Sequence, residues 1–307
     1  MAATLIVSRK QLGDLLLLLP AMEHLHREES CDLYVAARSG SAALYELMPC
    51  RPQPAAAFSD EVFDRLYCFE ASRATSLVCA WTRSRCKILG LTRPALPAWQ
   101  RRVFDDIRVR DVSATYRGGV FHALAGGDPA RFAPPALLTP PAAWLPTGLP
   151  PRYYVLHPTA AWQRKTWEAA SWREVVVALH RRLGLTCVLT SGPADWEVAM
   201  ASAIATDLDA PVVNLAGRTN LRQYLAVLSR AAGTLCIDGS ASHLSAAFGR
   251  PTLTLFGPTN PLHWHWPTPA TPRLYAGDFV AERKPPAGAI PHAAVRDAAL
   301  ALLGAEA

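Results

Sequence analysis

The sequence predicts an α/β protein built from two doubly wound, parallel-sheet domains. Short apolar runs alternate with amphipathic helical segments along the 307 residues, a pattern typical of parallel sheets. A proline-rich stretch, residues 132–152, interrupts this alternation near the middle of the chain and favours an extended connector. Two domains of about 150 residues each also match the size at which single cores usually stop growing. We therefore expect an N-terminal domain over residues 1–150 and a C-terminal domain over residues 151–307.

The expected elements follow one another in strand and helix alternation. In the first domain the strands are Thr4–Val7, Leu33–Ala36 and Leu66–Phe69, and the helices are Leu15–Arg27, Ser41–Leu47 and Ala71–Trp81. In the second domain the strands are Tyr153–His157, Cys187–Ser191, Val212–Leu215, Leu235–Ile237 and Thr252–Phe256. Its helices are Ser171–Leu183, Asp195–Ala205, Leu221–Ala231 and, near the end of the chain, Ala293–Leu303.

Composition excludes several classes of protein. Half of the residues are hydrophobic and 18% are charged, which excludes a disordered or fibrous chain. No apolar run reaches the roughly 18 uncharged residues that a transmembrane helix needs. The opening residues, MAATLIVSRK, predict a strand and lack a signal-peptide pattern. We expect a cytoplasmic protein without a transmembrane segment.

The cysteines and histidines predict no metal site. The seven cysteines are scattered, odd in number and mostly set in apolar runs, so we expect buried thiols. No pair has the Cys-Xaa-Xaa-Cys spacing of a zinc site. His263 and His265 alternate without nearby carboxylates or thiolates, which is poor metal geometry.

The segment from Leu235 to Pro261, LCIDGSASHLSAAFGRPTLTLFGPTNP, predicts a compact βαβ unit. After its first strand, the amides of residues 240–242 are free donors at a helix start, where the helix dipole favours phosphate oxygens. Asp238, Gly239 and Ser240 form the turn, and the small residues allow close approach of a ligand. An ordinary helix capped by Ser or Asp explains the same residues equally well.

Asp14 follows the first expected strand at a turn into a helix. A carboxylate held there can accept the proton of an attacking hydroxyl, as a general base does. The local sequence also fits a simpler role, in which Asp14 caps a helix that begins at Leu15.

Three segments, read together, resemble glycosyltransferase family 9, the lipopolysaccharide heptosyltransferase family. They are GDLLLLLPAMEHL from Gly13, HPTAAWQRKTWEAASW from His157, and NLAGRTNLRQYLAVLSRA from Asn214, which leads into DGSASHLSAAFGRP and FGPTNP. The resemblance implies the glycosyltransferase B fold, with two Rossmann-like domains facing each other across a cleft. It also implies an inverting, metal-independent transfer of a heptose or similar sugar from an ADP-sugar to a saccharide hydroxyl.

The resemblance also implies roles for single residues. Asp14 lies at the position of the family's catalytic base, and Lys165 at that of the lysine that contacts the diphosphate. The resemblance places the remaining donor-binding residues at Thr159, Asp238, Gly239, Ser240 and His243. Two departures from the family pattern are present: the loop from Thr159 to Lys165 is one residue longer, and Gly239 precedes Ser240 rather than following a hydroxyl residue.

The adenosine and the sugar of the donor are expected to bind at loops that follow neighbouring strands. Residues 191–197 and 216–219 are candidates for adenosine recognition, with Glu197 on the ribose hydroxyls and Thr219 in the second loop. Thr259 is a candidate for the donor-sugar end. Glu197 also fits a solvated helix start, and Thr259 fits a simple turn bracketed by prolines.

A basic stretch in the first domain suggests an anionic acceptor. Residues 73–117 contain ten Lys or Arg against three Asp, and Arg73, Arg83 and Arg85 are candidate contacts for phosphate or carboxylate groups. A solvated basic face explains each residue equally well. Nucleic acid is not expected, because aromatic residues are not interleaved with these charges.

The sequence therefore predicts a monomeric glycosyltransferase that uses an ADP-sugar as co-substrate and needs no other cofactor. Its acceptor is a saccharide of the lipopolysaccharide core or another saccharide; a lipid-linked acceptor would bring the enzyme briefly to the inner membrane surface. Two alternatives stay open. One is a family 9 transferase with another nucleotide sugar or a small-molecule acceptor. The other is a catalytically inactive protein that binds a nucleotide sugar.

Overall fold

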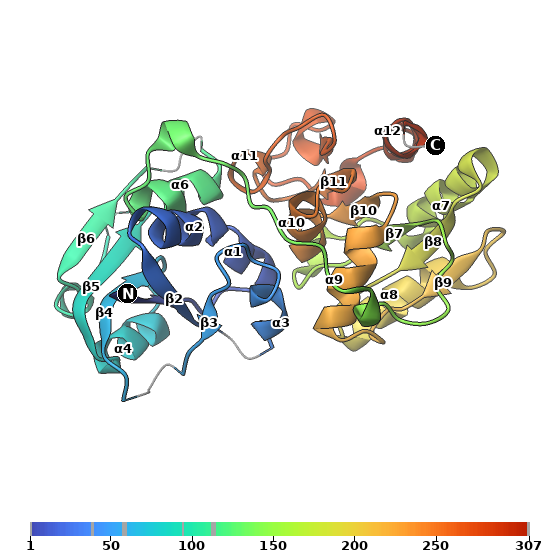
Figure 1. Cartoon of the computed structure of the whole chain (residues 1–307). Coiled ribbons are helices and arrows are strands. Elements are labelled where there is room, and N and C mark those ends of the chain that lie inside the picture. The colour runs from blue at the N-terminus through green and yellow to red at the C-terminus, as the bar shows by residue number, and fades with distance from the viewer. Residues whose placement is uncertain (1, 38–39, 57–59, 94, 112–114, 306–307) are drawn as a thin grey trace. The chain divides into compact units, whose positions relative to one another are not determined.

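The computed structural model describes residues 2–37, 40–56, 60–93, 95–111 and 115–305. The chain divides into two compact units, Met1–Leu138 and Thr139–Ala307, and the division falls inside the proline-rich stretch (Figure 1). Each unit has its own six-stranded sheet, and every recorded strand pairing in both sheets is parallel. The predicted fold class, two doubly wound α/β units, is confirmed.

The N-terminal unit has the strand order β3-β2-β1-β4-β5-β6. Its strands are β1 (Ala2–Val7), β2 (Cys31–Ala36), β3 (Gln53–Pro54), β4 (Phe63–Cys68), β5 (Ser84–Leu91) and β6 (Asp106–Val109). Its helices are α1 (Leu12–Leu16), α2 (Leu19–Glu28), α3 (Ala42–Tyr45), α4 (Arg73–Trp81), α5 (Ala98–Arg101) and α6 (Arg117–Leu124), and a short 3-10 turn, η1, follows at Pro129–Arg131.

The C-terminal unit repeats this arrangement with the order β12-β11-β10-β7-β8-β9. Its strands are β7 (Tyr153–His157), β8 (Thr186–Leu189), β9 (Val212–Asn214), β10 (Thr234–Ile237), β11 (Thr252–Phe256) and β12 (Arg273–Tyr275). Its helices are α7 (Ala169–Leu183), α8 (Asp195–Ala205), α9 (Leu221–Arg230), α10 (Ser240–Ala247), α11 (Pro261–Trp264) and α12 (His292–Gly304). The 3-10 turns are η2 (Ala142–Trp144), η3 (Gln163–Lys165), η4 (Ala276–Asp278) and η5 (Ala287–Ala289).

Both sheets therefore have the doubly wound order in which the chain starts in the middle, moves outward, and returns to the middle to wind the other way. The reversal falls between β1 and β4 in the first sheet and between β7 and β10 in the second. Ligands of such sheets bind outside the carboxyl ends of the strands at this point.

The sequence predicted the C-terminal elements more closely than the N-terminal ones. The single helix expected over Leu15–Arg27 is two helices, α1 and α2, that meet next to Pro20. Strands β3, β5, β6 and β12 were not predicted. The first half of β5, SRCK, holds two cations and is only partly buried, so the apolar run that marks a buried strand is absent there.

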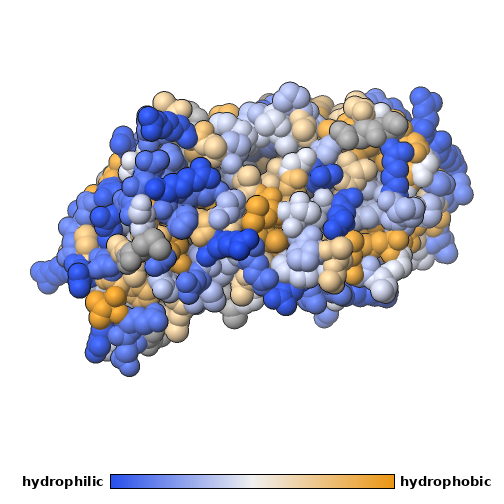
Figure 2. Space-filling model, in the orientation of Figure 1, coloured by the Kyte–Doolittle hydropathy of each residue, from blue (hydrophilic) through white to orange (hydrophobic). Residues whose placement is uncertain are grey.

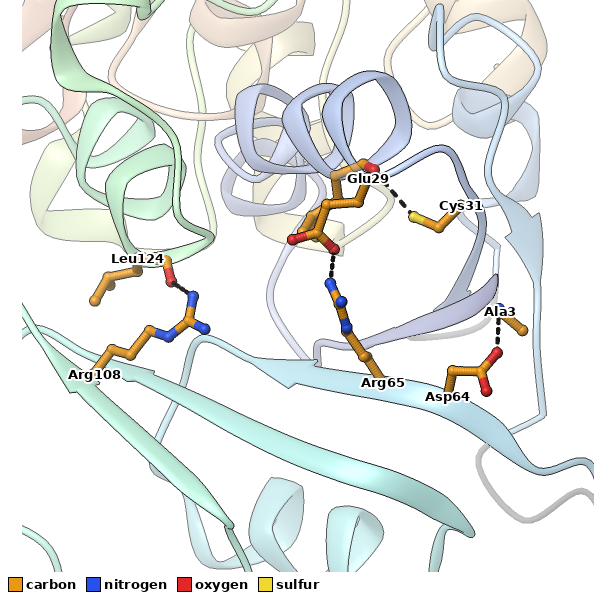
Figure 3. Close-up of polar contacts among 8 residues, drawn as sticks. Ala3, Glu29, Cys31, Asp64, Arg65, Arg108 and Leu124 are labelled. Atoms are coloured by element: carbon orange, nitrogen blue, oxygen red, sulfur yellow. Dashed lines mark hydrogen bonds and ion pairs between the residues drawn. The ribbon is translucent and has the colours of Figure 1, made fainter. Parts of the chain in front are cut away.

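Polar contacts join strands of the N-terminal sheet to one another and to neighbouring helices (Figure 3). Asp64 on β4 accepts from the Ala3 amide on β1 at 2.9 Å, and Arg108 on β6 donates to the Leu124 carbonyl at the end of α6 at 3.0 Å. Arg65, the residue after Asp64, forms an ion pair with Glu29 at the end of α2. Because successive strand residues point to opposite faces, Arg65 lies on the α2 face and Asp64 on the other.

The C-terminal unit has the deeper core. Strands β7, β10 and β11 are buried along their whole lengths. The indoles of Trp167 and Trp172 pack edge to face, with ring centroids 4.8 Å apart. Trp167 also donates through Nε1 to the Ile290 carbonyl at 3.0 Å, which ties the segment before α12 to the start of α7. This core fixes the strand ends from which the candidate donor loops emerge.

All seven cysteines are free thiols, and six of them are buried, as predicted. In the part of the chain that the structure describes, no helix has both the length and the apolar character to cross a membrane.

Candidate functional site

The candidate donor site lies at the carboxyl ends of β7 and β10, where the winding of the second sheet reverses. His157 is the last residue of β7, and the loop that follows it carries Thr159 and Lys165. Asp238 directly follows β10 and leads into α10. The fold therefore brings together residues separated by more than 70 positions in the sequence.

Lys165, Asp238 and Thr259 form one polar network. The Lys165 ammonium lies 2.6 Å from Asp238 Oδ2, and the Thr259 hydroxyl donates to the same oxygen at 2.6 Å. Lys165 Nζ also donates to the Asp238 backbone carbonyl at 3.3 Å. The side chains of Lys165 and Asp238 are only 17% and 4% exposed, so each charge depends on the other for compensation. Three loops, after β7, β10 and β11, are thus joined at one point.

The start of α10 lies beside this network. Gly239 is the N-cap, its backbone is extended, and no side chain caps the helix. The first amides of α10 therefore have no partner within the helix. A Cβ placed on Gly239 would lie 3.4 Å from Ala160 Cβ, so the β7 loop closely approaches the turn. The predicted anion site thus has free amide donors and a nearby ammonium.

Thr159 contributes a hydroxyl without a partner. The residue is 1% exposed, and its Oγ1 is among the buried side-chain atoms that make no hydrogen bond within the described residues. An unsatisfied buried hydroxyl costs about 1–3 kcal/mol. Thr159 lies in the same loop as Lys165, and a ligand oxygen at this loop would supply the missing partner.

A second cluster, which the sequence did not predict, lies under the start of α10. His157 Nδ1 is 2.9 Å from Thr190 Oγ1 and 3.5 Å from the Tyr224 hydroxyl, and Tyr224 in turn hydrogen-bonds with Ser240. Burial lowers the pKa of His157 to about 4 and raises the pKa of Tyr224. The ring of His157 is therefore neutral at physiological pH, and its Nδ1 links Thr190 and Tyr224 through hydrogen bonds. The HPT sequence that contains His157 was visible, but Tyr224 lies on an ordinary amphipathic helix and gives no local signal.

Glu197 lies in the first turn of α8, the helix that follows β8, and Thr219 lies in the loop after β9. Glu197 is 7% exposed in the first turn of α8, so it is not a solvated helix residue. Its carboxylate occupies the space that a Cβ on Gly192 would need. Thr219 is half-buried just before Asn220, which caps α9 in a capping box. Contacts of Glu197 and Thr219 with adenosine stay predictions.

His243 lies in the first turn of α10 and is half-buried. It is close enough to His265 to affect it electrostatically: burial lowers the pKa of His265 to about 4, and the charges of Arg273 and His243 act in the same direction. Within the described ranges, no group of three His, Cys, Asp or Glu side chains has the geometry to hold a metal ion.

Asp14 lies inside α1 and not at its cap. The helix begins at Leu12 with Gln11 as N-cap, and no side chain caps it. The capping role that the local sequence allowed is therefore wrong. Asp14 is half-buried and interacts electrostatically with Arg117 at the start of α6. Burial lowers the pKa of Arg117, and the charge of Asp14 opposes this shift. The fold places Asp14 on the segment that leaves the carboxyl end of β1, at the reversal point of the first sheet.

The three candidate acceptor arginines do not lie together. Arg73 is the first residue of α4, on the segment that leaves the carboxyl end of β4. Arg83 and Arg85 lie at the other edge, where β5 begins, and pair with Asp60 at 3.9 Å and Asp64 at 3.2 Å. At about 3.3 Å per residue, β5 separates Arg85 from the carboxyl edge by about 20 Å. Arg73 alone of the three lies at the edge from which Asp14 emerges.

The N-terminal unit also has a polar pocket of about 250 Å³ beside α2 and α6, which the sequence did not predict. Its charged and titratable lining residues are Glu23, His24, Arg27, Glu28, His122, Asp128 and Arg131. Because carboxylates, guanidinium groups and imidazoles alternate around it, the lining favours no single class of ligand.

Comparison with known proteins identifies the second unit. Residues 140–277 match the model of glycosyltransferase family 9 (heptosyltransferase). They form a glycosyltransferase family 9 domain. This confirms the resemblance predicted from the motifs at His157, Asn214 and Asp238, whereas the Gly13–Asp14 motif lies outside the matched residues.

Curated relatives support the same assignment. A lipopolysaccharide heptosyltransferase 3 from Escherichia coli is 32% identical over 148 residues, which are 46% of this chain and 43% of the relative. A lipopolysaccharide heptosyltransferase 1 from Salmonella typhimurium is 38% identical over 97 residues, which are 32% of this chain and 29% of the relative. The chain thus matches less than half the length of these curated relatives.

Solved structures extend the likeness to both units. A family 9 glycosyltransferase from Veillonella parvula has a TM-score of 0.85 at 15% identity, and the match covers 99% of this chain and 98% of that one. The Escherichia coli heptosyltransferase WaaC, solved with ADP, has a TM-score of 0.76 at 18% identity, covering 99% and 100%. These matches show that the chain has the glycosyltransferase B fold.

Proposed function

We propose that the protein transfers a heptose or similar sugar from an ADP-sugar to a saccharide hydroxyl, with inversion at the anomeric carbon. The observation that carries the proposal is the buried Lys165–Asp238–Thr259 network beside the uncapped start of α10, inside a family 9 domain. An ammonium group and free amides at a helix start can together bind a diphosphate without a metal ion.

The donor lies with its diphosphate at the start of α10. Lys165 and the first amides of α10 neutralise the negative charge that grows on the leaving ADP as its bond to the sugar breaks. Gly239 places no side chain at the helix start, and the Thr159 hydroxyl gains the partner that it lacks. Ser240 and His243, in the first turn of α10, are further donors to the phosphates.

Lys165 must loosen its contact with Asp238 to reach a phosphate. Asp238 then keeps the hydroxyl of Thr259, which lies on the loop assigned to the donor sugar. Glu197, at the start of α8, and Thr219, in the loop after β9, bind the adenosine. Because Lys165 supplies positive charge at the diphosphate, the transfer does not require a metal ion there.

Asp14 acts as the general base. The acceptor oxygen attacks the anomeric carbon from the face opposite ADP, and the new bond forms as the bond from that carbon to the phosphate oxygen breaks. The acceptor proton passes to the Asp14 carboxylate, and ADP leaves with the bonding electron pair. Arg73, at the same edge of the sheet, is the better placed of the three arginines to contact an anionic acceptor.

The test is transfer by the purified chain from ADP-heptose to deacylated lipopolysaccharide inner core, followed by mass spectrometry of the saccharide. The proposal requires a mass gain of one heptose and release of ADP. Parallel reactions with UDP- and GDP-sugars identify another donor if one is used. Tight binding of ADP-heptose without transfer to any saccharide would instead establish a binding protein without activity. The cytoplasmic location and monomeric state expected from the sequence remain predictions.

A further inference from the structure

The outer surface of α4 and α5 combines exposed apolar side chains with cations. Helix α4 buries Thr75, Ser76, Val78 and Cys79 against its sheet. Its outward face carries Leu77 and Trp81, four residues apart, which are 49% and 76% exposed. Ala74 and Ala80 are also exposed, so after Arg73 the outward face of α4 presents only apolar side chains.

Helix α5 packs beside the first half of α4. Gln100 is buried and donates through Nε2 to the Ala71 carbonyl at 3.2 Å and to Ser76 Oγ at 2.8 Å, which fixes α5 against the first half of α4. Trp99, the residue before Gln100, is 40% exposed. We call Leu77, Trp81, Trp99, Arg101 and Arg102 the α4–α5 surface.

Positive charge surrounds these apolar groups. Arg101 and Arg102 are both exposed directly after Trp99. Lys87 reaches across from β5, and its ammonium donates to the Ala80 carbonyl at the end of α4, 3.2 Å away. Between Glu70 and Asp105 the sequence has seven Lys or Arg and no Asp or Glu, and two of the seven, Arg83 and Arg85, pair with Asp60 and Asp64. Figure 2 shows an apolar group at the lower left, where Figure 1 places α4, with strongly hydrophilic side chains around it.

From this combination we propose that the α4–α5 surface docks on an anionic lipid bilayer. Tryptophan and leucine enter the boundary between headgroups and acyl chains, and nearby cations are attracted to anionic headgroups. Tryptophan and arginine are also enriched in protein interfaces, so a second copy of the chain is the competing occupant that the test distinguishes. The proposal does not depend on the sugar that the protein transfers, since binding to vesicles is measured without donor or acceptor.

The test is flotation of the full chain with vesicles of phosphatidylcholine alone or of phosphatidylcholine mixed with phosphatidylglycerol. The proposal requires binding to the mixed vesicles, weak binding to the neutral ones, and loss of binding in high salt, because salt screens the headgroup charges. Leu77→Ser/Trp81→Ser should reduce the partition coefficient by about tenfold or more. Arg101→Gln/Arg102→Gln should reduce it by about fivefold per charge, and only on anionic vesicles.

Two matched controls distinguish vesicle binding by this surface from nonspecific binding by other exposed groups. Leu138→Ser/Phe279→Ser removes two exposed apolar side chains, 41% each, from elsewhere in the chain. Arg182→Gln/Arg230→Gln removes two exposed cations from the C-terminal unit. Both controls should bind mixed vesicles like the wild type, and thermal melting should show that every variant is folded.

Three results would overturn the proposal. The first is wild-type protein that does not float with mixed vesicles. The second is an equal loss of binding in the controls. The third is a concentration-dependent dimer in light scattering that Leu77→Ser/Trp81→Ser abolishes while vesicle binding is unchanged, which would assign the surface to a second copy of the chain.

Discussion

The two units share one strand order, yet their candidate functional residues are organised differently. In the C-terminal unit, Lys165, Asp238 and Thr259 come from three loops and contact one another directly. In the N-terminal unit, Arg83 and Arg85 each pair with a separate exposed or partly exposed acid, far from Asp14 along the strands. The family model also matches residues 140–277 and not the first unit.

This difference follows from what each unit is proposed to bind. A nucleoside diphosphate has fixed dimensions and two charged groups, so the residues that hold it need a fixed geometry in a buried, preorganised network. A saccharide acceptor presents many hydroxyls and varies in its charges. Residues that contact it can change without loss of the donor site.

The largest expected effect is in the N-terminal unit. Asp14→Asn keeps the shape of the side chain but removes the base, so turnover should fall by roughly 10²–10⁴-fold while affinity for ADP is unchanged. Rates of ADP release and calorimetry with ADP measure the two quantities. Asp60→Asn, which alters a fully exposed acid in the same unit, is the control. Turnover close to that of the wild type would rule out Asp14 as the base.

The next effect concerns the buried ion pair of the C-terminal unit. Lys165→Met leaves the Asp238 carboxylate buried without its cation, so the free energy of unfolding should fall by about 3 kcal/mol. Adding Asp238→Asn should recover part of this loss, although neither variant should bind ADP well. Denaturant unfolding of the two variants measures the difference.

Arg181→Gln is the matched control for this pair. Arg181 and Asp209 lie 2.7 Å apart, nearly the same separation, but their side chains are 66% and 83% exposed. Loss of such a pair should cost less than about 1 kcal/mol. Equal costs for Lys165→Met and Arg181→Gln would contradict the view that the network is buried and preorganised.

A third prediction concerns pH and the histidine under α10. Because the pKa of His157 is lowered to about 4 in the folded protein and is ordinary in the unfolded chain, only the unfolded chain takes up this proton between about pH 6.5 and 4. Stability is therefore full above pH 6.5 and falls as the pH drops through this window, by on the order of 2–3 kcal/mol.

His157→Gln should flatten this pH dependence in denaturant titrations at pH 7 and pH 4.5. His265 contributes in the same direction, since its pKa is also lowered to about 4, so part of the slope should remain. His292 is exposed, and His292→Gln serves as the control variant. An unaltered slope in His157→Gln would show that His157 titrates normally.

The smallest effects are expected among the arginines of the N-terminal unit. Arg73→Gln should raise the acceptor KM several-fold, as expected when one charge-assisted contact is lost. Arg83→Gln/Arg85→Gln should leave KM unchanged and shift stability by less than about 0.5 kcal/mol, because their ion pairs are exposed. If the double variant raises KM more than Arg73→Gln does, the acceptor is bound at the edge where β5 begins.

The sequence predicted five of the six strands of the C-terminal unit, because these are short, mainly apolar runs, and its site residues follow those strands. Asp238 and Lys165 could be placed at one sheet edge, but their ion pair could not be predicted, since it depends on the path of a loop. The cluster of His157, Thr190 and Tyr224 was missed for the same reason. In the N-terminal unit, β5 was missed because its first residues are polar and charged. Arg83 and Arg85 were therefore grouped with Arg73 across a strand that separates them.

The central claim is that the C-terminal unit holds an ADP-sugar through Lys165 and the start of α10. Isothermal titration of the full chain with ADP, UDP and GDP, first without metal and then with magnesium, tests it most directly. We predict that ADP binds best, that magnesium changes its affinity little, and that Lys165→Met weakens binding while Arg181→Gln does not. Binding of UDP or GDP in preference to ADP, or ADP binding that Lys165→Met leaves intact, would contradict the account.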